Sequence, residues 1–429
     1  MKSPASLPLL TPLSLPNGAV IPNRVAKAAM EENMADPGQV PGAALRALYG
    51  AWARGGAGLL ITGNVMIDGR AMTGPGGLVL ERATPREPFA AWAREARSNG
   101  AQVWMQINHP GRQVFAAMKG EAWAPSAIAL DLGKHSGLFA KPRAMTEVEI
   151  AEVILRFADT AAAAEEAGFT GVQIHAAHGY LISQFLSPLA NRRTDGWGGS
   201  LDNRARLLLD VVKAVRARVS PGFCVAVKLN SADFQRGGFS ESEARQVLLW
   251  LNELPVDLVE LSGGSYEAPA MQGRAADGRT LAREAYFLEF AKELAAVASM
   301  PVMTTGGIRR RAVAEQVLAS GVAMVGVATA LATRPELPNA WFAGRELDVP
   351  QQVVAWKDKG LVGLANMALV KRRLRAVGAG EGGLKSYSPV FTLIADQMRT
   401  KRLVKRYRAW LGRCDATSWP GWILRLRAG

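Results

Sequence analysis

The chain has 429 residues, of which 49% are hydrophobic and 21% are charged, a composition typical of a globular protein with a sizeable core. No continuous apolar run is long enough to predict a membrane span. The cysteines, Cys224 and Cys414, lie far apart, which argues against a disulfide framework or a four-cysteine metal or iron–sulfur site. With no signal segment recognisable at the N-terminus, we expect a cytoplasmic protein, and Cys224 within an apolar strand predicts a buried, inert thiol.

The net charge of +14 is unevenly distributed along the chain. Residues 345–429 contain 17 Lys and Arg against 6 Asp and Glu, a net charge of +11. The basic character therefore belongs to a C-terminal segment, and the sequence predicts two parts: residues 1–345 and a basic helical extension, residues 346–429.

Short apolar runs alternate with helical patterns along the first part. Helical periodicity is clearest at 147–167, 201–219, 241–254 and 283–298, and Gly and Pro mark the joins. Continuous apolar strands that alternate with amphipathic helices predict an α/β fold with parallel strands, here a (β/α)8 TIM barrel with a C-terminal helical extension. A doubly wound sheet competes, but the chain lacks its GxGxxG fingerprint after the first strand. The strands are predicted at 25–29, 59–62, 103–106, 172–175, 224–229, 258–261, 302–304 and 324–327.

The fourth predicted strand ends in an unusual group of polar side chains, His175, His178 and Tyr180. In a barrel of this kind the active site lies where the strands end. Two imidazoles and a phenol suit the polarisation of a carbonyl oxygen and the delivery of a proton beside it. Two alternatives remain open here: a metal pair, for which the segment offers no third ligand, and histidines with a purely structural role.

Other strand ends carry further candidates. Gln106 ends the third strand, and Lys228 lies inside the apolar fifth strand, where burial requires a partner. That partner is either a neighbouring carboxylate or an electron-rich ligand atom. Glycine-rich loops follow the sixth and seventh strands and favour a phosphate-bearing cofactor; they contain Ser262, Gly263, Gly306 and Gly307.

Several strings resemble the Old Yellow Enzyme family of FMN-dependent NAD(P)H:flavin oxidoreductases. They are NRVAKAAM (23–30), GGAGLLI (55–61), QINHPGR (106–112) and the run from 174 to 204 that begins IHAAHGYL. The resemblance covers roughly residues 6–342. It implies a short form of the family without the cysteine cluster of its iron–sulfur relatives.

The resemblance also implies roles for individual residues. His175 and His178 would bind the substrate carbonyl oxygen and Tyr180 would donate the proton. NADH or NADPH would reduce FMN, which would then reduce the C=C bond of an α,β-unsaturated carbonyl compound in a ping-pong order. The residues implied to contact FMN are Ala28, Ala29, Met30, Gly63, Gln106, Lys228, Ser262, Gly263, Gly306, Gly307, Ala328 and Thr329.

Two positions depart from the family pattern. Glu31 stands where the family often has Thr or Cys near the flavin, which leaves the flavin potential and the substrate range open. Thr329 stands at the position of the family's phosphate-binding arginine, and a hydroxyl brings no charge to that site. Arg309, Arg310 or Arg311 would have to compensate. A flavin-binding protein with lost or altered catalysis and a metal-dependent TIM-barrel hydrolase or lyase are the alternative functions.

Residues 346–429 lie outside the resemblance. Basic amphipathic patterns at 360–375 and 398–410, and Trp419 and Trp422 near the end, predict short basic helices. Packing on the barrel or at a homo-oligomer interface, and contact with an anionic membrane surface or an acyl-CoA-like phosphate, are both compatible with this pattern. No fold typical of nucleic-acid binding is recognisable.

Overall fold

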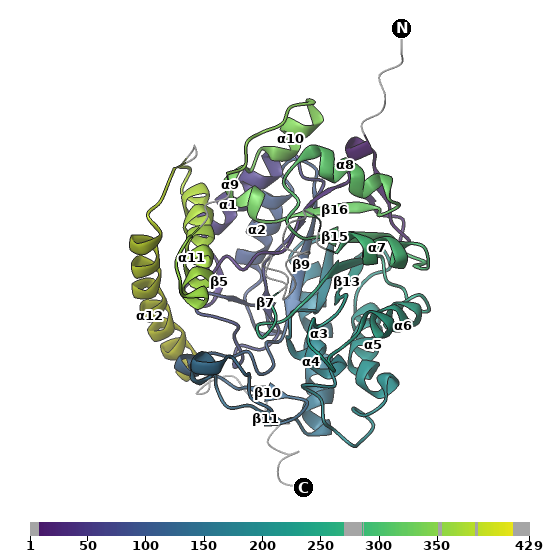
Figure 1. Ribbon diagram of the computed structural model, residues 1–429, viewed down its shortest axis with the longest axis vertical. Coiled ribbons are helices and arrows are strands. Elements are labelled where there is room, and N and C mark those ends of the chain that lie inside the picture. Colours follow the sequence, from purple (N-terminus) through teal and green to yellow (C-terminus); the bar gives the residue numbers. More distant parts are fainter. Residues whose placement is uncertain (1–7, 270–284, 286, 351–353, 382–384, 415–429) are drawn as a thin grey trace.

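Eight parallel strands form a closed barrel in the computed structural model of the chain (Figure 1). The structure describes residues 8–269, 285, 287–350, 354–381 and 385–414. Each strand pairs with the next, and the last, β16, pairs with the first, β3, which closes the ring. In ring order the strands are β3 (Val25–Lys27), β6 (Leu59–Ile61), β9 (Gln102–Asn108), β12 (Gly171–Ala176), β13 (Cys224–Asn230), β14 (Leu258–Ser262), β15 (Val302–Thr305) and β16 (Met324–Val327).

Helices follow the barrel strands and cover the outside of the ring (Figure 1). Thr146 and Ser240 begin α3 and α6 with capping boxes, in which the N-cap hydroxyl and the Glu three residues later each bind a backbone N–H. The helices are α1 (Ala43–Arg54), α2 (Glu87–Ala96), α3 (Glu147–Glu166), α4 (Leu181–Leu186), α5 (Leu201–Arg218), α6 (Glu241–Leu251), α7 (Leu288–Ala295), α8 (Arg311–Ala319), α9 (Thr329–Thr333) and α10 (Leu337–Phe342).

Short strands and 3-10 helices lie at the two ends of the barrel. The hairpin of β1 (Leu13–Ser14) and β2 (Val20–Ile21) packs Leu13 and Ile21 against the apolar interior of the barrel. The loops after the barrel strands carry the remaining short elements. These are β4 (Ala35–Asp36), β5 (Val40–Pro41), β7 (Val65–Met66), β8 (Leu78–Val79), β10 (Trp123–Ala124), β11 (Arg143–Ala144), η2 (Ala116–Met118) and η3 (Gly133–Leu138), while η1 (Pro8–Leu10) precedes β1.

Side chains alternate between two cores along each barrel strand, as the period of a β-strand requires. In β13, Val225, Val227 and Leu229 join the core between barrel and helices, whereas Cys224 and Ala226 join the interior cluster. The continuous apolar runs in the sequence therefore reflect strands that are buried on both faces.

The basic C-terminal segment folds into two long helices on one flank of the barrel (Figure 1). Helix α11 (Lys359–Gly378) packs on α1, and α12 (Pro389–Cys414) lies outside α11. Three side chains of α12 reach barrel loops: Tyr407 Oη donates to the Gly69 carbonyl at 2.8 Å, and Arg399 and Arg406 donate to the carbonyls of Asn33 and Ala35. The extension is thereby joined to loops that follow β3 and β6.

The predicted barrel and all eight strand positions are confirmed. Cys224 is buried, and burial raises the pKa of its thiol to about 12, as expected for an inert cysteine. The expectation of short C-terminal helices is wrong, because α11 and α12 have 20 and 26 residues. Trp419, Trp422 and part of the predicted helix at 283–298 lie outside the described residues. The boundary between residues 345 and 346 stays a prediction.

Tyr407 offers a test of how much α12 contributes to stability. The residue is fully buried and joins the cluster that contains Met66, Met72 and Met118. We expect Tyr407→Phe to cost about 1 kcal/mol of unfolding free energy, because it removes one hydrogen bond. Tyr407→Ala should cost about 3–5 kcal/mol, because it also leaves a cavity.

Urea unfolding of the full chain measures both values. Phe391→Ala is the matched control, because Phe391 lies on the outer face of the same helix and is 72% exposed. An unfolding curve for Tyr407→Ala that overlays that of the control would contradict the packing of α12.

Candidate active site

Polar side chains replace apolar ones at the carboxyl end of the barrel interior. The inward positions of β13 continue from Cys224 and Ala226 to Lys228 and Asn230, all buried. The same alternation turns Gln106, Gln173, His175, Glu260 and Ser262 inward from the strands on either side. This end of a parallel barrel is where active sites form.

A chain of hydrogen bonds connects these inward side chains across the barrel interior, from β9 through β12 to β14. Gln106 Nε2 donates to Gln173 Oε1 at 2.7 Å, and Gln173 Nε2 donates to Glu260 Oε2 at 2.7 Å. The other carboxylate oxygen, Glu260 Oε1, accepts from Lys228 Nζ at 2.8 Å and from Thr305 Oγ1 at 2.6 Å. Glu260 is therefore the buried carboxylate that pairs with Lys228.

His175 and His178 lie side by side at the end of β12, with ring centroids 5.0 Å apart. His178 adopts the left-handed conformation, with φ at +62°, which is uncommon for a residue other than glycine. Asn230 holds this turn by accepting the His178 backbone N–H at 3.1 Å, and Ser262 Oγ lies 2.8 Å from His178 Nε2. The turn brings both imidazoles to one place.

Both histidines are neutral at physiological pH. Burial lowers the pKa of each imidazole well below its usual value, and Lys228 nearby lowers it further. His175 Nδ1 accepts the backbone N–H of Ala177 at 3.2 Å, so the single proton of the neutral ring is on Nε2. Among the described residues Nε2 has no hydrogen-bond partner, which makes it a donor for a ligand.

Tyr180 completes the group, with its ring centroid 4.8 Å from that of His175. Its hydroxyl accepts from Asn64 Nδ2 at 3.3 Å and lies 3.1 Å from the hydroxyl of Tyr266, which is carried by the loop after β14. Burial raises the pKa of Tyr180 well above its usual value, and Tyr266 and Glu31 add to this shift. Tyr180 is therefore a protonated hydroxyl at neutral pH.

Glu31 belongs to the same end of the barrel. Its carboxylate accepts hydrogen bonds from Thr73 Oγ1 and from Asn33 Nδ2, the latter at 3.2 Å. It lies close enough to Tyr180 and Tyr266 for its charge to raise the pKa of both phenols. A carboxylate at this position therefore opposes the formation of a phenolate beside the histidines.

A second buried ionic group lies behind the site, between β3 and β6. Lys27 Nζ donates to the Ile61 carbonyl at 2.7 Å and lies 3.4 Å from Glu32 Oε1, while Tyr49 Oη donates to the same carboxylate at 2.5 Å. Burial lowers the pKa of Lys27 to about 8, although Glu32 opposes this shift. A Cβ at Gly63 would lie 2.1 Å from the Met30 carbonyl oxygen, so this packing requires glycine.

The remaining predicted residues lie where the barrel strands end. Ala28 follows β3, and Ala29 and Met30 continue the same loop. Gly306 and Gly307 follow β15 with φ values of +146° and +74°, backbone conformations that favour glycine. Thr329 begins α9 directly after Ala328, whereas Arg311 pairs with Glu315 along α8.

The family model described as NADH:flavin oxidoreductase / NADH oxidase matches residues 8–348. The NADH-dependent flavin oxidoreductase iliE of Hypocrea jecorina is 36% identical over 80% of this chain and 91% of its own length. The nadA enzyme of Aspergillus parasiticus, of the same description, is 39% identical over 68% of each chain. The chain belongs to this family. It is an oxidoreductase of the Old Yellow Enzyme type that uses FMN with NAD(P)H as the reductant.

Solved structures agree with this assignment. The Old Yellow Enzyme homologue from Zymomonas mobilis superposes with a TM-score of 0.68 at 26% identity, over 81% of this chain and 95% of its own. Morphinone reductase in complex with tetrahydroNAD has the same fold, with a TM-score of 0.67 over 80% of this chain and 92% of its own.

The polar end of the barrel suits FMN, the family's cofactor. Among the described residues, buried polar atoms there have no hydrogen-bond partner; they include Asn64 Oδ1 and both amide atoms of Asn108. Buried polar groups are rarely left unpaired unless a ligand or water satisfies them. Gln106, Lys228 and these atoms supply the mixed donors and acceptors that the polar edge of a flavin requires.

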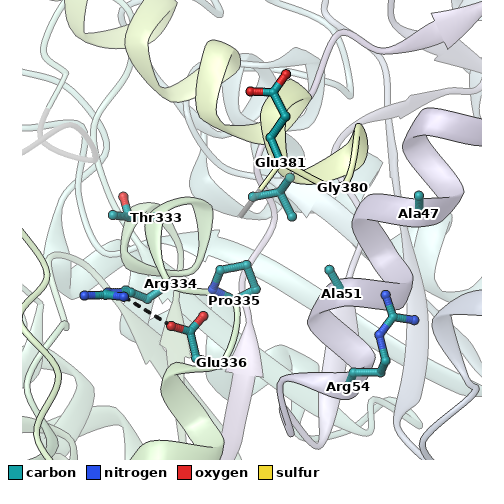
Figure 2. A pocket seen from close by; sticks show the side chains of 10 residues that line it. Ala47, Ala51, Arg54, Thr333, Arg334, Pro335, Glu336, Gly380 and Glu381 are labelled. Carbon is teal, nitrogen blue, oxygen red and sulfur yellow. Dashed lines mark hydrogen bonds and ion pairs between the residues drawn. The ribbon is translucent and has the colours of Figure 1, made fainter. Parts of the chain in front are cut away.

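A separate cavity of about 290 Å³ lies on the outside of the barrel (Figure 2). Figure 2 shows its walls, which come from α1, the turn after α9 and the end of α11. Arg334 and Glu336 pair across one wall at 3.5 Å. None of the flavin-site residues described above lines this cavity, so it lies apart from the candidate active site.

The candidate site contains residues that the sequence analysis did not predict. Glu260, Gln173, Tyr266 and the group around Lys27 were not singled out. Glu260 carried a usable signal, because it is a charged residue inside an apolar strand, as Lys228 is. Tyr266 carried none beyond its place in the glycine-rich loop after the sixth barrel strand.

The lowered pKa values of His175 and His178 predict how stability depends on pH. An unfolded histidine binds a proton near pH 6.5, whereas the buried rings do not, so acid favours the unfolded chain. These two rings should together lower the unfolding free energy of the apoprotein by about 3 kcal/mol between about pH 7.5 and pH 5.5.

Urea unfolding at the two pH values measures this loss. In the double variant His175→Asn/His178→Asn the loss should shrink by that amount and leave the share of other groups, chiefly His109, whose pKa burial lowers to about 4. Equal losses in the variant and the parent would show that the two imidazoles titrate normally.

Proposed function

We propose that this enzyme reduces the C=C bond of α,β-unsaturated carbonyl compounds by a ping-pong mechanism. The observation that carries the proposal is the neutral pair His175 and His178 beside the protonated hydroxyl of Tyr180. Two neutral imidazoles can donate hydrogen bonds to a carbonyl oxygen without transferring a proton to it. A hydroxyl with a raised pKa remains a proton source at neutral pH.

The two histidines would bind the substrate by its carbonyl oxygen. Negative charge grows on this oxygen as the β-carbon accepts a hydride, and the Nε2–H of His175 is available to meet it. Preorganised donors of this kind are typically worth about 3–4 kcal/mol each in the transition state. Tyr180 would then protonate the α-carbon of the resulting enolate, a step that typically contributes ~100–10,000-fold.

FMN, when bound, supplies the redox chemistry by accepting a hydride from NADH or NADPH and passing it to the β-carbon. Lys228 would face its pyrimidine edge together with Gln106, and the ion pair with Glu260 would hold the lysine there. We propose that the other residues named from the sequence contact the ring, ribityl chain and phosphate: Ala28, Ala29, Met30, Gly63, Ser262, Gly263, Gly306, Gly307, Ala328 and Thr329.

Absorbance spectroscopy of the purified protein tests the proposal. Flavin bands should be present, bleach on anaerobic addition of NADH or NADPH, and return when 2-cyclohexenone is added. Tyr180→Phe should leave the bleaching rate unchanged and slow the return about 100-fold or more, because the enolate has lost its proton donor.

Tyr387→Phe is the matched control, since it removes a phenolic hydroxyl beside Arg372 in the C-terminal extension. Bands that bleach and stay bleached in the wild-type protein would reject the enone as an oxidant. A protein that stays colourless after FMN is supplied would contradict the proposed flavin contacts.

The outer face of α12 supports a second proposal, contact with an anionic membrane surface. Phe391, Ile394 and Met398 recur on one side of the helix and are 72%, 52% and 69% exposed. Exposed basic residues continue the same side: Lys401, Arg402, Lys405 and Arg408. Apolar insertion combined with attraction of lysine and arginine to anionic lipid is the chemistry of a helix that lies on a membrane.

The described residues contain no helix long and apolar enough to cross a membrane, so the proposal concerns surface contact alone. A cytoplasmic location and a homo-oligomer stay predictions. Contact with an acyl-CoA-like phosphate likewise stays a prediction.

Co-sedimentation with phosphatidylglycerol-containing vesicles tests the membrane proposal. The protein should bind these vesicles, bind phosphatidylcholine vesicles much less, and be released by salt, because lysine and arginine charges are screened. The triple variant Phe391→Ser/Ile394→Ser/Met398→Ser should lose most of the binding.

Val148→Ser/Leu155→Ser is the control, because these two apolar side chains are 60% and 57% exposed on α3. Equal binding by the triple variant and the control would reject a membrane role for α12. A shift of the triple variant to a smaller species in size-exclusion chromatography would assign the face to a second copy of the chain instead.

A further inference from the structure

The hydroxyl of Tyr180 has a second phenol beside it. Tyr266 Oη lies 3.1 Å from Tyr180 Oη, and the two rings meet edge to face with centroids 6.0 Å apart. Tyr266 comes from the loop after β14, whereas Tyr180 begins α4 after β12. The contact is therefore made between two loops on different strands.

The loop that carries Tyr266 is firmly held on both sides of this residue. Glu267 forms a buried ion pair with Arg112 at 2.6 Å and accepts the backbone N–H of Asp131 at 2.8 Å. Ser265 Oγ accepts from Gln235 Nε2 at 3.2 Å. Anchors from three other segments give the Tyr266 hydroxyl a defined position over Tyr180.

The hydrogen-bond partners of the Tyr180 hydroxyl indicate that Tyr266 can donate a proton to it. A phenolic oxygen donates one hydrogen and accepts others. When Tyr180 directs its hydrogen to a substrate carbon, its oxygen can accept from both Asn64 Nδ2 and Tyr266 Oη. Tyr266 is then the only one of these two donors that has a transferable proton at neutral pH.

Electrostatics favour rapid return of a proton to Tyr180. Tyr180 is almost fully buried, and the carboxylate of Glu31 nearby disfavours a negative charge on either phenol. A Tyr180 phenolate left after proton transfer would be costly in this setting. Tyr266 is half-buried as a residue, whereas Tyr180 is buried.

We propose that Tyr266 positions Tyr180 and relays the proton that restores it. This inference rests on the proposed enone reduction. The Tyr180 O–H bond breaks as the bond from hydrogen to the α-carbon forms, and the Tyr266 proton moves to Tyr180. Water then returns a proton to Tyr266. The hydride comes from NAD(P)H by way of FMN and the proton from solvent, so atoms and electrons balance.

The decisive comparison is Tyr266→Phe against the wild-type holoenzyme in rapid-mixing absorbance experiments. The bleaching rate with NADH should stay the same. The return of the flavin bands with 2-cyclohexenone should slow about 10-fold or more, at unchanged half-saturating enone concentration, because a donor to the developing phenolate is lost.

A proton inventory in H₂O/D₂O mixtures separates relay from simple packing. The wild-type return rate should give a curved plot, because two protons move together, and Tyr266→Phe should give a straight line. Phe139→Leu is the control, since Phe139 packs on Tyr266 with ring centroids 5.9 Å apart but has no proton to give. It should keep the curved plot.

The outcomes separate the proton relay through Tyr266 from the proposed enone reduction. Equal rates and equal plots for Tyr266→Phe and the wild type would overturn the relay and leave the enone reduction intact. A slower return with an unchanged curved plot would also overturn the relay. A wild-type enzyme that 2-cyclohexenone does not reoxidise would overturn the proposed function, and the relay with it.

Discussion

The buried ion pair of Lys228 and Glu260 is the interaction on which the polar end of this barrel depends. A lysine and a glutamate inside a barrel each cost several kcal/mol of desolvation unless they meet each other and find further hydrogen bonds. Here adjacent strands place them at 2.8 Å, and Gln173 and Thr305 fill the remaining positions on the carboxylate. The pair thus allows the barrel interior to change from apolar to polar along its own strands.

The charged groups at the polar end of the barrel determine the protonation states of the neighbouring histidines and tyrosine. Lys228 keeps a positive charge close to His175 and His178, which reinforces the effect of burial on both imidazoles and favours their neutral forms. On the other side Glu31 places a negative charge near Tyr180, which favours the protonated phenol. Charges of opposite sign near the two groups thus favour neutral hydrogen-bond donors and a protonated phenol, the forms that the proposed C=C reduction requires.

The barrel and the core of the site could be predicted because their signals are local. Each barrel strand is one apolar run, and His175, His178 and Tyr180 lie within six residues, so a single turn brings them together. Glu260, Tyr266 and Glu32 are different, because their partners come from other strands and loops. Which of several strand ends face each other depends on barrel closure and register, which no local pattern in one sequence reveals.

The contacts of the C-terminal extension were likewise not predictable from local sequence patterns. Its composition predicted basic helices. Side chains of α12, however, donate hydrogen bonds to the backbone carbonyls of Asn33, Ala35 and Gly69. Because every residue has a backbone carbonyl, the sequence does not indicate which carbonyls are used. Asn33 in turn donates to Glu31 through its side chain. A short path of hydrogen bonds therefore runs from Arg399 on α12 through Asn33 to Glu31, whose charge acts on Tyr180 and Tyr266. The outer face of the same helix carries the exposed apolar and basic row, so a partner bound there would contact a helix that is hydrogen-bonded to the loops after β3 and β6.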